Sequence, residues 1–260
     1  MRTWWISLAL LACGAPRESL PNNVSNNSTV RIGPNDPLGW IGIATAPADT
    51  DSSTIAPSNA DHPLVTTAER AVLPAQVNAI GSSGTPQMFV TGARTQILYG
   101  CDGNQLDVTA FSGPRLPPGV AWILPPSRPA SWQPTPFAIT SRGAKPAQRS
   151  YTIGSLSIDL VRTGDLRGTL TILRDGRVVH TAPFERQLMD GADPSPIDLA
   201  EGGPGIPDPI AAWSIADGGP ILVVMRHPGY EGMSLKPLLV DATSARPIES
   251  MQTYLYHCAF

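Results

Sequence analysis

Charged residues are scarce in this chain of 260 residues, at 15% against roughly 25% in typical soluble domains. The formal net charge is −3, and no block of lysines or arginines occurs along the sequence. Nucleic acids and anionic lipid surfaces are usually bound through such basic blocks, so their absence argues against both as partners. Proline and glycine are abundant instead, with 28 and 24 residues, which predicts many turns and few long helices.

The sequence also lacks an apolar run long enough to cross a bilayer as a helix. The run from Trp4 to Ala12 has nine residues and follows one positive charge at Arg2. A helix that spans the hydrocarbon core needs about 20 residues, so this run cannot be a stable membrane span. One early positive charge before a short apolar run is typical of a secretory signal, which we expect to cover residues 1–12.

The junction after this run, Leu10-Leu11-Ala12-Cys13-Gly14, resembles the lipobox of bacterial lipoproteins. The resemblance implies a diacylglyceryl group, palmitate for example, on the thiol of Cys13, and a mature chain that starts there. Such a lipid would tether the protein, since each buried methylene contributes about 0.8 kcal/mol. Gly14, rather than an aspartate, follows the cysteine, which in the enterobacterial pattern favours the outer membrane. The alternative is an ordinary secreted protein, although Leu10 does not suit an A-x-A cleavage site.

Cysteine is rare, with three residues, and assigning Cys13 to lipid leaves Cys101 and Cys258. Exported proteins fold under oxidising conditions, so we expect these two to form a disulfide. Chain entropy predicts that closing the long loop between them contributes at most roughly 5 kcal/mol. The alternatives are two free buried thiols, or one exposed thiol that reacts with a partner.

Four segments follow from the distribution of polar and apolar residues. After the signal, residues 13–61 are rich in Asn, Ser, Thr, Pro and Asp, which predicts a flexible, disordered tether. The apolar patch 38–43 interrupts it and is interpreted as a strand that docks on the domain, the alternative being an exposed recognition element. Residues 62–86 are predicted to be a short helical or irregular lead-in, because Pro74 interrupts their helical pattern. Residues 87–260 are predicted to form the β-rich domain.

Alternating apolar residues and turn signals predict a mainly β fold, an antiparallel sandwich or barrel. The clearest hairpin is 168–180, where Asp175-Gly176 suits a type I′ turn. The run 221–225 is continuously apolar and suits a central strand. Other β-prone runs occupy residues 88–91, 96–101, 106–111, 151–161, 234–241 and 253–258.

Three details of these strands are expected from glycine and proline. Gly154-Ser155 is interpreted as a β-bulge within the strand 151–161. Pro237 places the strand 234–241 at an edge or a kink. The proline-rich segments 116–126 and 202–209 are predicted to be stiff loops.

Motifs for catalysis and metal binding are absent from the sequence. No Gly-x-Ser-x-Gly elbow occurs, and no two of His62, His180, His227 and His257 have the spacing of metal ligands. The acidic segment 190–201 lacks EF-hand spacing and is interpreted as a solvated turn rather than a calcium site. We therefore predict no cofactor and no metal, and the lack of these motifs favours a binding protein over an enzyme while leaving catalysis open.

The segment 226–232, Arg-His-Pro-Gly-Tyr-Glu-Gly, is the best candidate for recognition. Arg226, His227, Tyr230 and Glu231 follow the apolar strand on a turn that carries glycine and proline, a mixture typical of contact loops. The alternative is a hairpin loop without a partner.

The segment 99–108, Tyr-Gly-Cys-Asp-Gly-Asn-Gln-Leu-Asp-Val, resembles the opening strand pair of membrane-bound lysozyme inhibitors. The resemblance implies a strand pair with a disulfide-bonded cysteine, in a lipoprotein. The inhibitory Ser-Gly-x-x-Tyr segment is not matched, since Pro114, Arg115 and Leu116 follow Ser112-Gly113. The core is also about twice as long as that fold requires.

The sequence thus predicts a lipid-anchored lipoprotein of the cell envelope whose β-domain binds a protein or an envelope polymer. It leaves open whether the domain faces the periplasm or the cell surface. The alternatives are an envelope hydrolase with a dispersed active site, and a periplasmic inhibitor or immunity lipoprotein.

Overall fold

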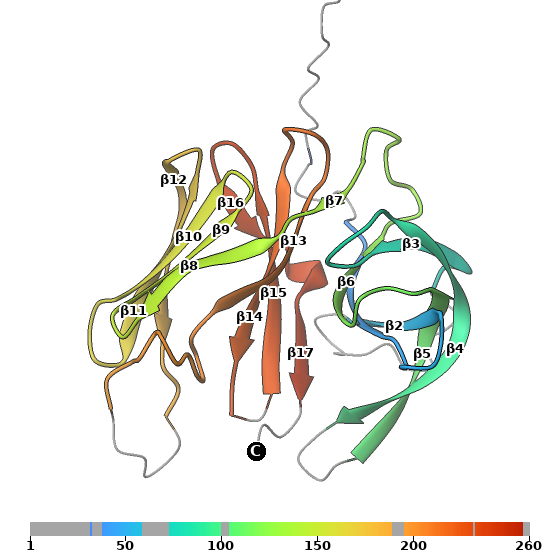
Figure 1. Ribbon diagram of the computed structural model, residues 1–260, viewed down its shortest axis with the longest axis horizontal. Coiled ribbons are helices and arrows are strands. Elements are labelled where there is room, and N and C mark those ends of the chain that lie inside the picture. The colour runs from blue at the N-terminus through green and yellow to red at the C-terminus, as the bar shows by residue number, and fades with distance from the viewer. Residues whose placement is uncertain are drawn as a thin grey trace, which may run out of the picture.

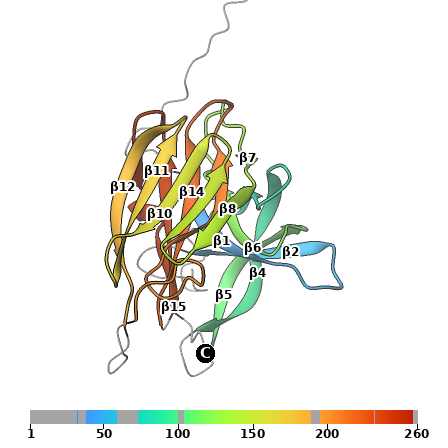
Figure 2. The same ribbon diagram turned by 60° about the vertical axis from the view of Figure 1, so that its left-hand side comes forward.

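A computed structural model describes residues 32, 38–58, 73–99, 104–188, 195–230 and 232–256. The fold is mainly β and antiparallel, as predicted, and it contains both a closed barrel and two further sheets. Figure 1 shows the five-stranded sheet on the left, the six-stranded sheet in the middle and the barrel on the right. Figure 2 shows the two sheets and the barrel after a turn of 60° about the vertical axis.

The barrel is closed by six strands in the order β1-β2-β5-β4-β3-β6. Its strands are β1 (Trp40–Thr45), β2 (Ser52–Ser58), β3 (Gln76–Ile80), β4 (Gln87–Tyr99), β5 (Asn104–Pro114) and β6 (Gly119–Leu124). Fully buried side chains fill it, among them Ile55, Phe89, Phe111 and Ile123.

The barrel corrects three predictions about the first half of the chain. The predicted tether 13–61 contains β1 and β2, and the lead-in 62–86 contains β3 instead of a helix. These strands are short and bounded by polar turns, so their own composition does not reveal the barrel that buries them. The apolar patch 38–43 does dock as a strand, because β1 pairs with β2 and β6. The predicted stiff loop 116–126 contains β6, which closes the barrel against β1 and β3.

The second half forms two sheets that face each other. The five-stranded sheet has the order β12-β11-β10-β9-β8 and contains β8 (Ile139–Lys145), β9 (Gln148–Ile153), β10 (Leu156–Arg162), β11 (Arg167–Arg174) and β12 (Arg177–Glu185). The other has the order β16-β15-β14-β13-β7, with β17 also paired to β15. Its elements are β7 (Thr135–Pro136), β13 (Asp208–Ser214), β14 (Ile221–Pro228), β15 (Gly232–Val240), β16 (Ala245–Pro247), the 3₁₀ turn η2 (Glu249–Met251) and β17 (Thr253–Tyr256).

The apolar run 221–225 lies in β14, a central strand with both faces buried, as predicted. Ile221, Val223 and Met225 belong to the core shared with the five-stranded sheet. Leu222 and Val224 belong to the core that faces the barrel. Successive side chains of a strand point to opposite faces, so a strand between two cores is apolar at every position.

Local turn signals were informative at the hairpins. Asp175 and Gly176 have φ values of +50° and +77° and join β11 to β12, which confirms the predicted turn. Gly154-Ser155 is the two-residue turn between β9 and β10, not a bulge, because Ile153 pairs directly with Leu156.

Longer-range pairing decided the other strand details. Residues 88–91 and 96–101 were predicted to be separate strands, whereas β4 is continuous from Gln87 to Tyr99, with a bulge between Thr91 and Ala93. Pro237 lies in β15 between the residues paired with β17 and those paired with β16. Its missing N–H therefore falls where the outer neighbour of the strand changes.

Three tryptophans lie where the barrel meets the six-stranded sheet. Trp122 of β6 and Trp213 of β13 are fully buried, with ring centroids 6.0 Å apart, and Trp132 lies 6.2 Å from Trp122. The indole N–H of Trp122 donates to the carbonyl of Leu38 at 2.6 Å. That of Trp213 donates to Gly81 at 2.7 Å, so both rings are held to the barrel by packing and hydrogen bonds.

Some predicted features lie outside the described residues, namely Cys13, Cys101 and Cys258, with the signal and the start of the tether. The disulfide between Cys101 and Cys258 and the lipid on Cys13 stay predictions. The strand pair expected from 99–108 is present as the end of β4 and the start of β5, where Tyr99 pairs with Asn104. Within the described part of the chain, no helix has the length and apolar character that a membrane crossing requires.

Candidate functional site

The structure separates the residues predicted for recognition. His227, on β14, and Tyr230, just after it, line a hollow of about 780 Å³. Arg226 is absent from this lining and contacts Asp208 instead. Glu231 lies outside the described residues.

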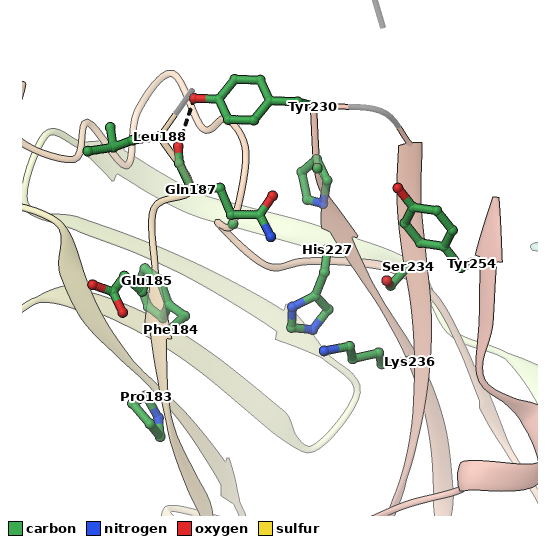
Figure 3. A pocket seen from close by; sticks show the side chains of 13 residues that line it. Pro183, Phe184, Glu185, Gln187, Leu188, His227, Tyr230, Ser234, Lys236 and Tyr254 are labelled. Carbon is green, nitrogen blue, oxygen red and sulfur yellow. Dashed lines mark hydrogen bonds between the residues drawn. The ribbon is translucent and has the colours of Figure 1, made fainter. Parts of the chain in front are cut away.

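The hollow lies between the edge of the five-stranded sheet and the neighbouring strands of the six-stranded sheet. One side comes from β12 and the residues after it, including Phe184, Glu185 and Gln187. The other comes from His227, from Ser234 and Lys236 on β15, and from Tyr254 on β17. Figure 3 shows His227, Lys236, Ser234 and Gln187 around one space, with Tyr230 and Tyr254 at its margin. Its volume is in the range typical of small-ligand sites, about 300–1,000 Å³.

Hydrogen bonds across the hollow hold its two sides together. The N–H of Gly205 donates to the carbonyl of Pro228 at 2.6 Å, and that of Gln187 donates to Pro204 at 3.2 Å. The hydroxyl of Tyr230 donates to the carbonyl of Gln187 at 2.8 Å, as the dashed line in Figure 3 marks. Gly205 has a φ of +85°, and a Cβ there would lie 2.0 Å from the carbonyl oxygen of Glu185, so only glycine fits this crossing.

The charges that line the hollow are not equivalent. Glu185 forms an exposed ion pair with Arg167 at 3.5 Å, and in Figure 3 its carboxylate points away from His227. Lys236 extends toward His227. Among the described residues, no carboxylate lies within ion-pair distance of Lys236.

The imidazole of His227 is neutral at physiological pH. Burial, and to a smaller extent the Lys236 ammonium, lower its pKa from 6.5 to about 4, while the Asp208 carboxylate opposes this shift. Because the hollow already holds one positive charge, adding a second would be costly. His227 therefore contributes hydrogen-bonding atoms without a charge.

Acid should destabilise the protein through His227. Below about pH 6.5 the imidazole of the unfolded chain binds a proton, whereas the folded imidazole binds one only near pH 4. Stability therefore decreases as the pH is lowered from about 6.5 to about 4. We expect wild type to lose up to about 3 kcal/mol more than His227→Gln between about pH 7 and about pH 4. Urea unfolding at the two pH values measures this difference. Equal losses in the two proteins would contradict the assignment.

Arg226 belongs to a charge cluster beside the hollow that is centred on the buried carboxylate of Asp208. The Asp208 carboxylate accepts a hydrogen bond from the Tyr151 hydroxyl at 2.6 Å. It also forms ion pairs with Arg149 at 3.1 Å and with Arg226 at 3.0 Å. The Arg149 guanidinium also lies 5.3 Å from the centroid of the Tyr151 ring. Burial and the Asp208 carboxylate raise the pKa of Tyr151, so the phenol stays protonated and donates. The cluster joins the two sheets, which is a structural role.

A second hollow of about 370 Å³ lies beside Arg174. The guanidinium of Arg174 donates to the carbonyls of Val240, Gly218 and Gly219 at 3.1, 3.3 and 2.8 Å. These hydrogen bonds connect β11 to the turns of the six-stranded sheet, so Arg174 has a structural role.

The other acidic residues and histidines considered from the sequence do not form a site among the described residues. Asp198 of the acidic segment accepts from the N–H of Ala200 at 2.8 Å, which makes it a turn residue, while Asp190 and Asp193 lie outside the described residues. His180 lies on β12 and is not part of the hollow's lining. His62 and His257 lie outside the described residues. Within the described ranges, no three His, Cys, Asp or Glu side chains are grouped to hold a metal ion.

Sequence reasoning missed the other half of the hollow, which comes from β12, β15 and β17. One signal was available, since Lys236 is the charged residue in the otherwise apolar stretch 235–240 of β15.

Comparison of the chain with protein-family models, with curated proteins and with solved structures found no match in any of the three.

Proposed function

We propose that this protein is a binding protein of the bacterial envelope, and that the hollow beside His227 holds a segment of an envelope polymer. The observation that carries the proposal is a ligand-sized hollow whose two sides are fastened by backbone hydrogen bonds. A site fixed before binding avoids the entropy cost of ordering it.

The lining favours a polymer over a protein as the ligand. Protein interfaces are usually centred on apolar and aromatic anchors and bury about 800 Å² on each partner. This hollow is concave and mixes the aromatic rings of Tyr230 and Tyr254 with polar Gln187, Ser234 and Lys236. Such a mixture suits a saccharide, which presents hydroxyls at its edge and C–H groups on its faces.

The same lining supports binding rather than hydrolysis. A catalytic histidine needs a pKa near the working pH and a hydrogen bond to an acid that orients it. His227 has a lowered pKa, and Glu185, the carboxylate in the described lining, is directed away from it.

Sedimentation with peptidoglycan sacculi, stripped of protein and lipid, tests this function. We expect wild type to sediment with the sacculi and Tyr254→Ala to lose at least about fivefold in affinity, since a stacked ring contributes about 1–3 kcal/mol by analogy with stacking on bases. Val161→Ala is the control, because Val161 is 43% exposed on β10, similar to the 40% of Tyr254, and does not line the hollow. Equal sedimentation of the two variants would place binding elsewhere.

We also propose that the chain is anchored by lipid on Cys13, in the outer membrane. The support is the lipobox, Leu10-Leu11-Ala12-Cys13. Cys13→Ala should leave the membrane fraction and appear among soluble proteins, because no lipid would then be attached. If the variant stayed in the membrane fraction, the anchor would be wrong.

A further inference from the structure

Lys236 is an unusual residue in this chain. Of 18 basic residues only two are lysines, Lys145 and Lys236. Lys145 lies on the exposed hairpin of β8 and β9, whereas Lys236 is half-buried in β15 and lines the hollow.

The charges around Lys236 are already neutralised by other groups. Arg149 and Arg226 share Asp208, and Arg167 contacts Glu185. Lys236 has no such partner among the residues that the structure describes. A partly desolvated ammonium without a counter-ion is costly, and an anion in the hollow would offset that cost.

The neighbours of Lys236 are neutral groups that can donate hydrogen bonds. The Ser234 hydroxyl, the Gln187 amide and the His227 imidazole border the same space. Because His227 stays neutral, the described lining carries one unmatched positive charge. A single ammonium balances a carboxylate better than a phosphate, which carries more charge and is more often held by arginine forks.

We propose that the hollow binds a carboxylate carried on a sugar ring, with Lys236 facing the carboxylate. Ser234 and Gln187 donate to the acid or to ring hydroxyls, and Tyr254 covers one face of the sugar. This inference rests on the proposed function and names the chemical class of its ligand.

Calorimetric titration with matched pairs of saccharides tests the inference. The acidic probes are trigalacturonate and the disaccharide of N-acetylglucosamine and N-acetylmuramic acid. Their neutral counterparts are the methyl ester of trigalacturonate and chitobiose. We expect wild type to bind at least one acidic probe at least about tenfold more tightly than its neutral counterpart, since a charge-assisted hydrogen bond contributes about 1.5–3 kcal/mol. This affinity should fall as salt rises from about 50 to about 300 mM.

Variants at the two lysines distinguish binding in the hollow from a general effect of the protein's charge. Lys236→Gln should lose at least about tenfold in affinity for the acidic probe, and Lys236→Arg, which keeps the charge, should lose less. Lys145→Gln is the matched control and should bind like wild type. Thermal unfolding verifies that each variant is folded.

The outcomes also distinguish the two proposals. One outcome is that wild type sediments with sacculi and yet binds neither acidic probe, or binds acidic and neutral probes equally. In either case the assignment of a carboxylate as the ligand group is wrong, and the proposed binding function stands. The same holds if folded Lys236→Gln binds like wild type. If wild type binds neither sacculi nor saccharide, both proposals fail.

Discussion

Replacing Trp213 by alanine should lower the free energy of unfolding by about 3–5 kcal/mol. The ring is fully buried between the six-stranded sheet and the barrel, and its N–H donates to Gly81. Alanine would leave a cavity beside Trp122 and an unpaired carbonyl at Gly81, and both cost free energy.

Urea unfolding followed by circular dichroism measures this loss. Trp213→Phe keeps an aromatic ring and should lose less, while Val161→Ala, at an exposed position, should change stability by at most about 0.5 kcal/mol. A loss below about 1 kcal/mol in Trp213→Ala would mean that the tryptophans do not join the two halves as described.

Asp208→Asn should also destabilise the protein by about 3–5 kcal/mol. Asp208 is 7% exposed and neutralises both Arg149 and Arg226. An asparagine can still accept from Tyr151, but it leaves the two guanidinium groups without their counter-charge. Removing one partner of a buried ion pair is costly for this reason.

Asp159→Asn is the matched control for this substitution. Asp159 pairs with Arg142 at 3.2 Å, but the Asp159 side chain is 26% exposed, against 10% for that of Asp208. Exposed ion pairs contribute about 0–1 kcal/mol, so the control should lose little. Equal losses at the two positions would show that burial of the Asp208 cluster has no energetic consequence.

Features with a local cause could be predicted from the sequence. The Asp175-Gly176 turn depends on two residues that tolerate positive φ, and the strand 221–225 on its own apolar run. The barrel could not be predicted in this way, because β2 looks like polar linker and β1 like an isolated apolar strand until β5 and β6 pair with them. Closure of a sheet is a property of distant pairings and not of one segment.

The site shows the same division. His227 and Tyr230 were found because the sequence pattern placed both on a turn after a strong strand, although the structure has His227 within β14 itself. Lys236 and Tyr254 come from other strands, and only the fold brings them beside His227. Arg226 had the residue type expected for recognition, but its contact with Asp208 makes it part of the fold.

Hydrogen–deuterium exchange, with and without soluble fragments of peptidoglycan, tests the location of the binding site most directly. Phe184, Glu185, Gln187 and Leu188 line the hollow on one side, and His227, Tyr230, Ser234 and Lys236 line it on the other, so ligand should slow the exchange of their backbone amides. The barrel strands β4 and β5 should exchange equally in both conditions. If ligand slowed exchange in β4 and β5 but not in the residues that line the hollow, the binding site would not be the hollow.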